Sequence, residues 1–266
     1  MTPLLSAGDI MSQSWQFFTS HWKPLLKRAS WFLLVFVLYV VFAVPASMKH
    51  AWGAYAIVLV LYVLGALVAV THLTLYILRE NGVNLTSPNL ARRAVDLLAP
   101  LLWIVILTLV ILSISSIVFL LPAIWLGVSL SFAYLFLLED NIRGVAALKA
   151  SYHLIKGRWW ATLWRLLVPS IVIAIAIWAV SVVIWLVVGL VAGGSLFGIF
   201  AGLGNGANVG ANIAGGFVGI FILFLAMLVG VIMQLATLFV AFCYPMIVRI
   251  KLFHSLKQSA LLREVK

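Results

Sequence analysis

The stretch KASYHLIKGRWW (residues 149–160) gathers cations and aromatic rings in a chain that is 65% apolar. If the stretch is helical, one face carries an apolar stripe with 4-3-4 spacing, which Val145 extends backwards: Leu148, Tyr152, Ile155 and Trp159. Lys149, Lys156 and Arg158 flank the stripe, which is typical of a helix lying in the plane of a membrane interface. The stripe then faces lipid, or it packs on neighbouring spans as a linker helix, and both alternatives can hold for different turns.

The composition requires a membrane. The 266 residues carry a net charge of +11, a mean hydropathy of +1.23 and only 9% charged residues, whereas a soluble domain has roughly a quarter of its residues charged. We therefore expect an integral membrane protein. The single cysteine, Cys243, excludes an intrachain disulfide and is expected to be a packing residue. The amphipathic N-terminal segment lacks the apolar core and cleavage site of a removable signal peptide, so none is expected.

Six apolar runs are long enough to be spans, because about 20 helical residues cross a bilayer core. We predict them at about 29–47, 54–78, 98–120, 122–138, 163–192 and 217–248. Between the last two lies a charge-free segment, 193–216, in which nine of 24 residues are glycine. We interpret it as a flexible exterior loop, because each glycine weakens a helix by about 1 kcal/mol. A re-entrant or helix-packing segment is the alternative.

The distribution of charge predicts the sidedness. If 97–138 crosses twice, with a turn near Leu121-Pro122, then both termini and the segments 79–97 and 139–165 share one side. That side holds all six acids and every Lys and Arg except Lys49. Since basic residues stay cytoplasmic, we expect a multi-pass protein of the cytoplasmic (inner) membrane with both termini in the cytoplasm.

Interfacial helices are predicted three times, at about 7–22, 88–97 and 141–160. The 4-3-4 stripe recurs in the first two of them: Met11, Trp15, Phe18 and Trp22, then Leu90, Ala94, Leu97 and Leu101. Start signals precede the three helices: Ser6-x-x-Asp9, Ser87-Pro88 and Asp140-Asn141. The sequence thus predicts an all-α membrane protein, one polytopic domain over 1–266, built from three pseudo-repeated units of an interfacial helix and a transmembrane hairpin.

The segment LEDNIRGVAALKASYHLIKGRWWATLWRLL (residues 138–167) resembles the membrane domain associated with bacterial glycerophosphodiester phosphodiesterases, and related inner-membrane families. The residues that carry this resemblance are an acid after a span, an Ala-Leu-Lys-x-Ser helix and a Lys-Gly-Arg-aromatic run: Glu139, Ala147-Leu148-Lys149, Ser151, Lys156-Gly157-Arg158 and Trp159-Trp160. The resemblance implies a cytoplasmic-membrane location. It implies no hydrolase activity, because in that family the chemistry belongs to a separate soluble barrel, for which we find no room in this chain.

Candidate sites for chemistry are few. His72 and Gln234 are the polar side chains expected inside spans, either as hydrogen-bonded packing residues or as an intramembrane polar site. Glu139, Asp140 and His153 are the clustered acid–base groups, but a continuous helix would hold Asp140 and His153 about 20 Å apart. We expect helix capping from Asp140, no catalytic site, no metal and no cofactor.

The leading hypothesis is a non-enzymatic accessory or organising protein that binds anionic lipid or a protein partner, with a homo-oligomer as a further option. The contacting residues would be the basic and aromatic side chains of the cytoplasmic helices: Lys27, Arg28, Arg92, Arg93, Lys149, Lys156, Arg158 and Trp159. The alternatives are a transporter or flippase that works between hairpin units, and a lipid headgroup enzyme. A nucleic-acid partner is not expected, because the aromatic rings lie on the stripe that a membrane would cover.

Overall fold

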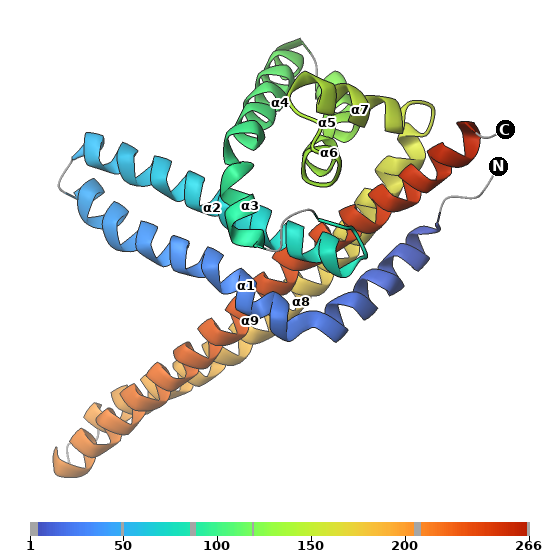
Figure 1. Ribbon diagram of the computed structural model, residues 1–266. Coiled ribbons are helices and arrows are strands. Elements are labelled where there is room, and N and C mark those ends of the chain that lie inside the picture. The colour runs from blue at the N-terminus through green and yellow to red at the C-terminus, as the bar shows by residue number, and fades with distance from the viewer. Residues whose placement is uncertain (1–4, 49–50, 86–88, 119, 205–208, 265–266) are drawn as a thin grey trace. The chain divides into compact units, whose positions relative to one another are not determined.

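The computed structural model describes residues 5–48, 51–85, 89–118, 120–204 and 209–264, and every regular element in these ranges is a helix (Figure 1). This confirms the predicted all-α class. Within the same ranges, six segments are long and apolar enough to cross a membrane: Ala7–Pro45, Trp52–Glu80, Leu98–Ser116, Leu121–Asp140, Trp159–Val191 and Val218–Leu261. The predicted number of helices that are long and apolar enough to span a membrane is therefore confirmed.

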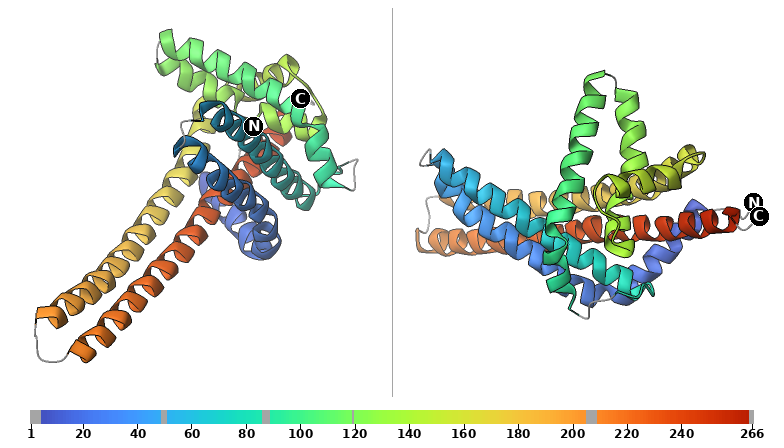
Figure 2. Two further views of the ribbon diagram at one scale, coloured as in Figure 1. Left: turned by 90° about the vertical axis from the view of Figure 1, so that its left-hand side faces the viewer. Right: turned by 45° about the horizontal axis from the view of Figure 1, so that its top comes forward.

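The first hairpin consists of α1 (Ala7–Met48) and α2 (Trp52–Glu80), which pack side by side (Figures 1 and 2). The predicted capping box starts α1, because the amide of Asp9 donates to Ser6 Oγ (3.1 Å) and the amide of Ser6 donates to Asp9 Oδ2 (3.2 Å). A kink at His21 (φ −118°, ψ 16°) lies one turn before Pro24, as expected where a proline disrupts the preceding turn. The kink separates the predicted interfacial helix from the first span.

The second pseudo-repeat begins with α3 (Leu90–Asp96) and continues into α4 (Leu98–Val118). Ser87 and Pro88 lie outside the described residues, and the cap of α3 is Asn89, whose Oδ1 accepts from the amide of Arg92 (3.3 Å). The fourth span is broken into α5 (Leu120–Leu130) and α6 (Ala133–Asp140). Pro122 stands in the first turn of α5, where a proline is tolerated. Helix α4 ends at Val118 and α5 begins at Leu120, close to the predicted turn near Leu121-Pro122.

The third pseudo-repeat comprises α7 (Val145–Ile155), α8 (Trp159–Gly204) and α9 (Val209–Glu264). The predicted interfacial helix 141–160 is shorter than expected. Asn141 has a left-handed conformation (φ 54°) and ends α6, while Gly144 and Gly157 have φ values of 58° and 79° and bound α7. Asp140 and Asn141 therefore do not cap α7, which corrects the predicted role of Asp140, because this pair lies at the end of the preceding helix.

The segment 193–216 is mostly helical, so the interpretation as a flexible loop is wrong on both sides of the undescribed residues 205–208. Helix α8 continues to Gly204 and α9 begins at Val209. The glycine penalty used for that interpretation was measured in water. In an apolar environment each backbone group needs an internal partner, which favours the helix.

The chain divides into two compact units, Met1–Pro169 with Cys243–Lys266 (unit 1) and Ser170–Phe242 (unit 2). All Lys, Arg, Asp and Glu residues belong to unit 1. The C-terminal part of α9 contributes to the core of unit 1, where seven of its described side chains are no more than 2% exposed: Cys243, Ile247, Val248, Ile250, Leu252, Phe253 and Leu256. The ring of Phe253 lies 5.0 Å from Phe136 and 5.9 Å from Phe132, centroid to centroid. The sequence had assigned no element to this stretch after 248.

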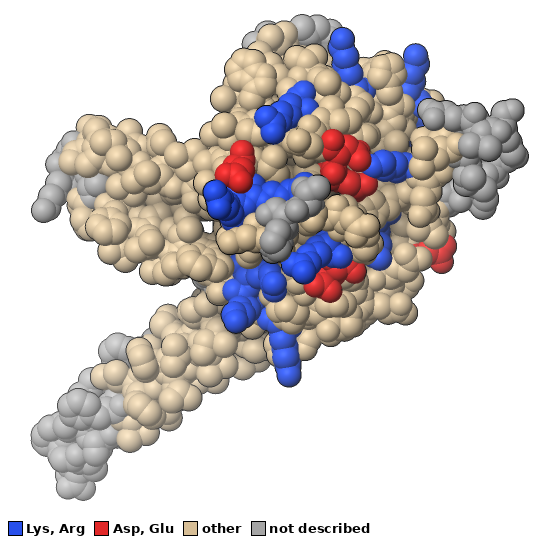
Figure 3. All heavy atoms as spheres, in the orientation of Figure 1, with Lys and Arg blue, Asp and Glu red and all other residues tan. Residues whose placement is uncertain are grey.

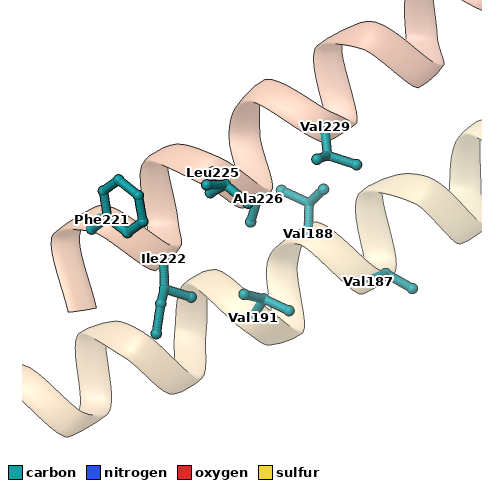
Figure 4. A pocket seen from close by; sticks show the side chains of 8 residues that line it. All are labelled: Val187, Val188, Val191, Phe221, Ile222, Leu225, Ala226 and Val229. Carbon is teal, nitrogen blue, oxygen red and sulfur yellow. The ribbon is translucent and has the colours of Figure 1, made fainter. Parts of the chain in front are cut away.

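Unit 2 is a pair of adjacent helices, the later part of α8 and the earlier part of α9 (Figure 2). A shallow apolar groove of about 290 Å³ lies between them, and Figure 4 shows its lining: Val187, Val188, Val191, Phe221, Ile222, Leu225, Ala226 and Val229. The helices approach closely at Gly230, where an added Cβ would lie 2.8 Å from Val188 Cγ2.

The three predicted apolar stripes have different outcomes. In α3 and the start of α4 the stripe is buried, with Leu90, Leu97 and Leu101 each 6% exposed and Ala94 fully buried. In α7, Leu148 and Ile155 are buried against the protein, so lipid-facing burial is wrong for these two residues and packing on neighbouring spans holds. Val145 is 52% exposed.

In α1 the buried face coincides with the predicted stripe only at Phe18, which is 7% exposed. The other buried side chains of this part of α1 lie beside the stripe: Ile10, Ser14, Phe17 and Leu25. Trp15 and Trp22 of the predicted stripe are 49% and 46% exposed, as is common for tryptophan at a membrane interface.

Candidate membrane-surface site

Ser151 closes the break in the fourth span. Its hydroxyl donates to Ser129 O (2.7 Å) and accepts from the amide of Phe132 (3.2 Å), and its side chain is fully buried. These two backbone groups lose their helical partners where α5 ends and α6 begins. The serine of the Ala-Leu-Lys-x-Ser sequence thus joins α7 to a broken helix, because a buried backbone group without a partner is costly.

A cluster of four charged or titratable side chains joins the end of α6 to α9; we call it the α6–α9 cluster: Glu139, Asp140, His254 and Lys257. The Nζ of Lys257 lies 2.7 Å from Glu139 Oε1 and 2.8 Å from Asp140 Oδ1, and His254 Nε2 lies 3.0 Å from Glu139 Oε2. The side chain of Glu139 is 13% exposed and that of Lys257 is 31% exposed. Lys257 therefore bridges the two acids, and its single positive charge offsets one of their two negative charges.

The sequence predicted Glu139, Asp140 and His153 as clustered groups, but the structure joins the two acids to α9 instead. His153 is exposed on α7, with its ring against Tyr152 (5.8 Å between centroids). The predicted separation of about 20 Å between Asp140 and His153 assumed one continuous helix. The helix break at Asn141–Gly144 means that there is no such helix. The residues that the sequence missed are His254 and Lys257. One sequence signal could have indicated them. His254 and Lys257 have i, i+3 spacing, which puts both on one face of a helix, and the adjacent acids Glu139 and Asp140 are suitable partners for such a pair.

Three side chains predicted to contact headgroups bind the protein instead. Arg93 donates through Nη2 to Leu138 O (3.0 Å), Arg158 donates through Nη1 to Ser259 Oγ, and Trp159 donates through Nε1 to Trp125 O (3.0 Å). Burial lowers the pKa of the Arg93 guanidinium from its ordinary value, which is so far above neutrality that the group stays charged. Arg93 thus links α3 to α6. Arg158, which directly precedes α8, links the start of that helix to α9, and Trp159 links α8 to α5.

Four of the five remaining predicted cations are exposed: Lys27, Arg92, Lys149 and Lys156. Four more cations share this exposure: Lys23, Arg79, Arg143 and Arg249. Figure 3 shows blue side chains distributed over one face of unit 1, with fewer red ones among them. Eight exposed cations stand against six acids in the whole chain, two of which are held by Lys257, so unit 1 has an excess of exposed positive charge.

Arg28, the last predicted cation, lies at a polar hollow between α1, α2 and α3. The hollow measures about 450 Å³ and is lined by Arg28, His72, Arg79, Asn89, Leu90 and Ala91. The guanidinium of Arg28 stacks on the ring of Tyr76 at 3.7 Å and its Nη1 donates weakly to Pro24 O (3.4 Å). His72, predicted as an intramembrane polar residue, thus faces a hollow that also contains two arginines.

Gln234, the other predicted intramembrane polar residue, lies in the α9 part of unit 2. Its side-chain Oε1 is buried and has no hydrogen-bond donor among the described residues, while its backbone carbonyl accepts from Thr237 Oγ1 (2.8 Å). Within the described ranges, no group of three or more His, Cys, Asp or Glu side chains is arranged to hold a metal ion.

Comparison with protein-family models, curated proteins and solved structures finds no match to this chain. The resemblance of 138–167 to the glycerophosphodiester phosphodiesterase membrane domain therefore stays a prediction. The structure does provide a physical role for several residues that carry it: Glu139 pairs with α9, Ser151 closes the helix break, and Arg158 binds Ser259.

Proposed function

We propose that the protein is a non-enzymatic accessory or organising component of the cytoplasmic membrane, and that unit 1 binds anionic lipid headgroups through its exposed cations. The observation that carries this proposal is the segregation of charge. Every formal charge lies in unit 1, eight described cations there are exposed, and two of the acids are paired with Lys257.

The cationic side would face the cytoplasm, because Lys and Arg are retained on that side during membrane insertion. Both termini would then be cytoplasmic, since Lys23, Lys27 and Arg28 precede the apolar run of α1, and Arg249, Lys251 and Lys257 follow the apolar run of α9. The cytoplasmic leaflet carries anionic lipids, and each surface cation near it contributes about 1 kcal/mol of attraction. Exposed lysines, which have flexible stems, can reach the headgroups.

The test measures the preference of the full chain for anionic over zwitterionic lipid. The chain is reconstituted into phosphatidylcholine vesicles with a trace of spin-labelled phosphatidylglycerol or phosphatidylcholine, and the protein-bound fraction of each label is measured by electron paramagnetic resonance. The variant replaces three exposed lysines of α1 and α7, Lys27, Lys149 and Lys156, with glutamine. We expect the phosphatidylglycerol preference to fall by up to about fivefold for each cation, since 1.4 kcal/mol corresponds to tenfold.

The matched control replaces the same three lysines with arginine, which keeps the charge and should keep the preference. Raising the salt concentration should reduce the preference of the natural chain, because exposed charges are screened over roughly 10 Å at 0.1 M salt. A triple glutamine variant that retains the natural preference would refute lipid binding by this surface.

A second candidate, lipid headgroup chemistry, draws on the hydrogen bond between Glu139 and His254. A carboxylate that orients an imidazole is a common general-base arrangement. Lys257 occupies the other Glu139 oxygen, however, which favours a structural pairing. A His254→Gln variant expressed in cells separates the two: an altered headgroup composition supports catalysis, and an unchanged composition together with lower protein stability supports the structural pairing.

A further inference from the structure

The hollow between α1, α2 and α3 has the side chains of an anion site. Two guanidinium groups, Arg28 and Arg79, line it with the imidazole of His72 and the amide of Asn89, while Leu90 and Ala91 supply an apolar wall. Arginine binds phosphate oxygens well, because its planar fork presents several N–H donors in fixed geometry. The hollow therefore combines donors suited to a phosphate group with a surface suited to hydrocarbon.

Neither guanidinium is neutralised by an acid within the described residues, where the ion pairs involve His21, His254 and Lys257 instead. The nearest acid in sequence is Glu80, whose carboxylate lies 3.8 Å from His21 Nε2. The ring stacking of Arg28 on Tyr76 uses the face of the guanidinium and leaves donors along its edge. The buried Nε of Arg28 has no acceptor in the described part of the chain.

The position of the hollow along the helices corresponds to the membrane boundary. Arg28 is the last cation before the apolar run of α1, and Arg79 is the first after the apolar run of α2. His72 lies seven residues before Arg79 on the same helix, which is about 10 Å deeper at 1.5 Å per residue. A ligand that spans the hollow would thus have its anionic group at headgroup level and an apolar part beside the wall.

We infer that this hollow binds a phosphate group, with the phosphodiester of an anionic phospholipid as the favoured source and free phosphate compounds as the other. Arg28 and Arg79 would hold the phosphate oxygens, and Leu90 and Ala91 would contact the start of an acyl chain. This inference rests on the proposed lipid-binding function, but it concerns one bound molecule and none of the three lysines tested above.

The experiment uses the full chain, purified and stripped of lipid in detergent, and counts bound phosphatidylglycerol by native mass spectrometry during a titration. We expect one tightly bound molecule. Arg79→Gln should weaken its binding about tenfold, because the variant loses a charge-assisted hydrogen bond to the phosphate oxygens. Arg143→Gln is the matched control, since it removes an exposed cation in the loop between α6 and α7, outside the hollow. It can lower the general preference for anionic lipid as any exposed cation would, but it should leave the affinity of the one tightly bound molecule unchanged.

A second variant, Ala91→Glu, places an acid in the hollow without removing either arginine, and should weaken the bound molecule at least as much. Competition by inorganic phosphate separates the sources: competition assigns the site to phosphate in general, and failure to compete assigns it to the phospholipid. Equal effects of Arg79→Gln and Arg143→Gln, or unchanged binding in both Arg79→Gln and Ala91→Glu, would overturn the inference. Failure here with an intact effect of the triple lysine variant leaves the proposed function standing.

Discussion

Lys257 Nζ and Glu139 Oε1 lie 2.7 Å apart, although 118 positions separate the two residues in the chain. The contact joins the end of α6 to the C-terminal part of α9, next to the Phe132, Phe136 and Phe253 rings of the unit 1 core. An ion pair of this kind, largely shielded from water, depends on both partners, because removing one leaves a poorly solvated charge.

Removing either partner of this pair should destabilise unit 1. We expect Glu139→Gln to cost about 2 kcal/mol and Lys257→Met to cost more, because two adjacent carboxylates then lose their cation. The double variant should cost less than the sum of the two single variants. The measurement is denaturant-induced unfolding of the full chain in detergent micelles.

Arg143→Gln serves as the control for this cycle, since Arg143 is exposed and its Nε donates only a long bond (3.3 Å) to Asn141 Oδ1. Its effect should stay within about 0.5 kcal/mol. Strict additivity of Glu139→Gln and Lys257→Met would show that the pair has no energetic coupling.

Ser151→Ala should destabilise the protein by about 1–3 kcal/mol, because the substitution leaves Ser129 O and the amide of Phe132 buried without a partner. Ser30→Ala is the comparison, since the exposed Ser30 hydroxyl only donates to the carbonyl of Lys27 in its own helix. Thermal unfolding in detergent measures both. Equal melting temperatures for the two variants would contradict the role given to Ser151.

Gly230→Ala should weaken the packing of unit 2, whereas Gly189→Ala in the same unit should not. An alanine Cβ at position 230 would lie 2.8 Å from Val188 Cγ2, and the helical valine has one strongly preferred rotamer, so overpacking should cost about 1–3 kcal/mol. No atom lies within 4 Å of the corresponding Cβ at position 189, where alanine instead gains up to about 1 kcal/mol of helix propensity. Opposite shifts in unfolding midpoint are therefore expected.

Labelling with a membrane-impermeant maleimide tests the predicted threading. Ser116 at the end of α4 and Val145 at the start of α7 are both exposed, and two crossings put them on opposite sides. In intact cells Ser116→Cys should react and Val145→Cys should not. The native Cys243 is fully buried and provides the unlabelled background. Labelling of both positions from outside would contradict the topology.

Much of the architecture can be predicted from local sequence patterns. The spans follow from apolar length, the Ser6–Asp9 cap from residue chemistry, and the buried stripe of α3 from helical periodicity. Each of these signals lies within a few turns of the residues that it describes, so one sequence is enough to read it.

The features that the sequence did not predict depend on partners far along the chain. The pairing of Glu139 with His254 and Lys257 requires α9 to continue past Val248, and no local pattern marks which helix an acid will meet. In α1 the small Ser14 lies on the buried face while the bulky Trp15 of the predicted stripe stays outside, although Phe18 of that stripe is buried as predicted. In the sequence, the helix break at Asn141–Gly144 is marked only by an asparagine and a glycine. Both residue types also occur inside helices, so they do not by themselves predict a break.

Unit 2 contains no Lys, Arg, Asp or Glu at any position, and this has a consequence for where the protein can reside. A helix pair without formal charges has no strongly hydrated side chain to fix its height, so it can follow a thinner or thicker bilayer by changing its tilt, at a fraction of a kcal/mol per Å of mismatch. Sorting by membrane thickness, which separates many proteins between compartments, would therefore act only weakly on this pair.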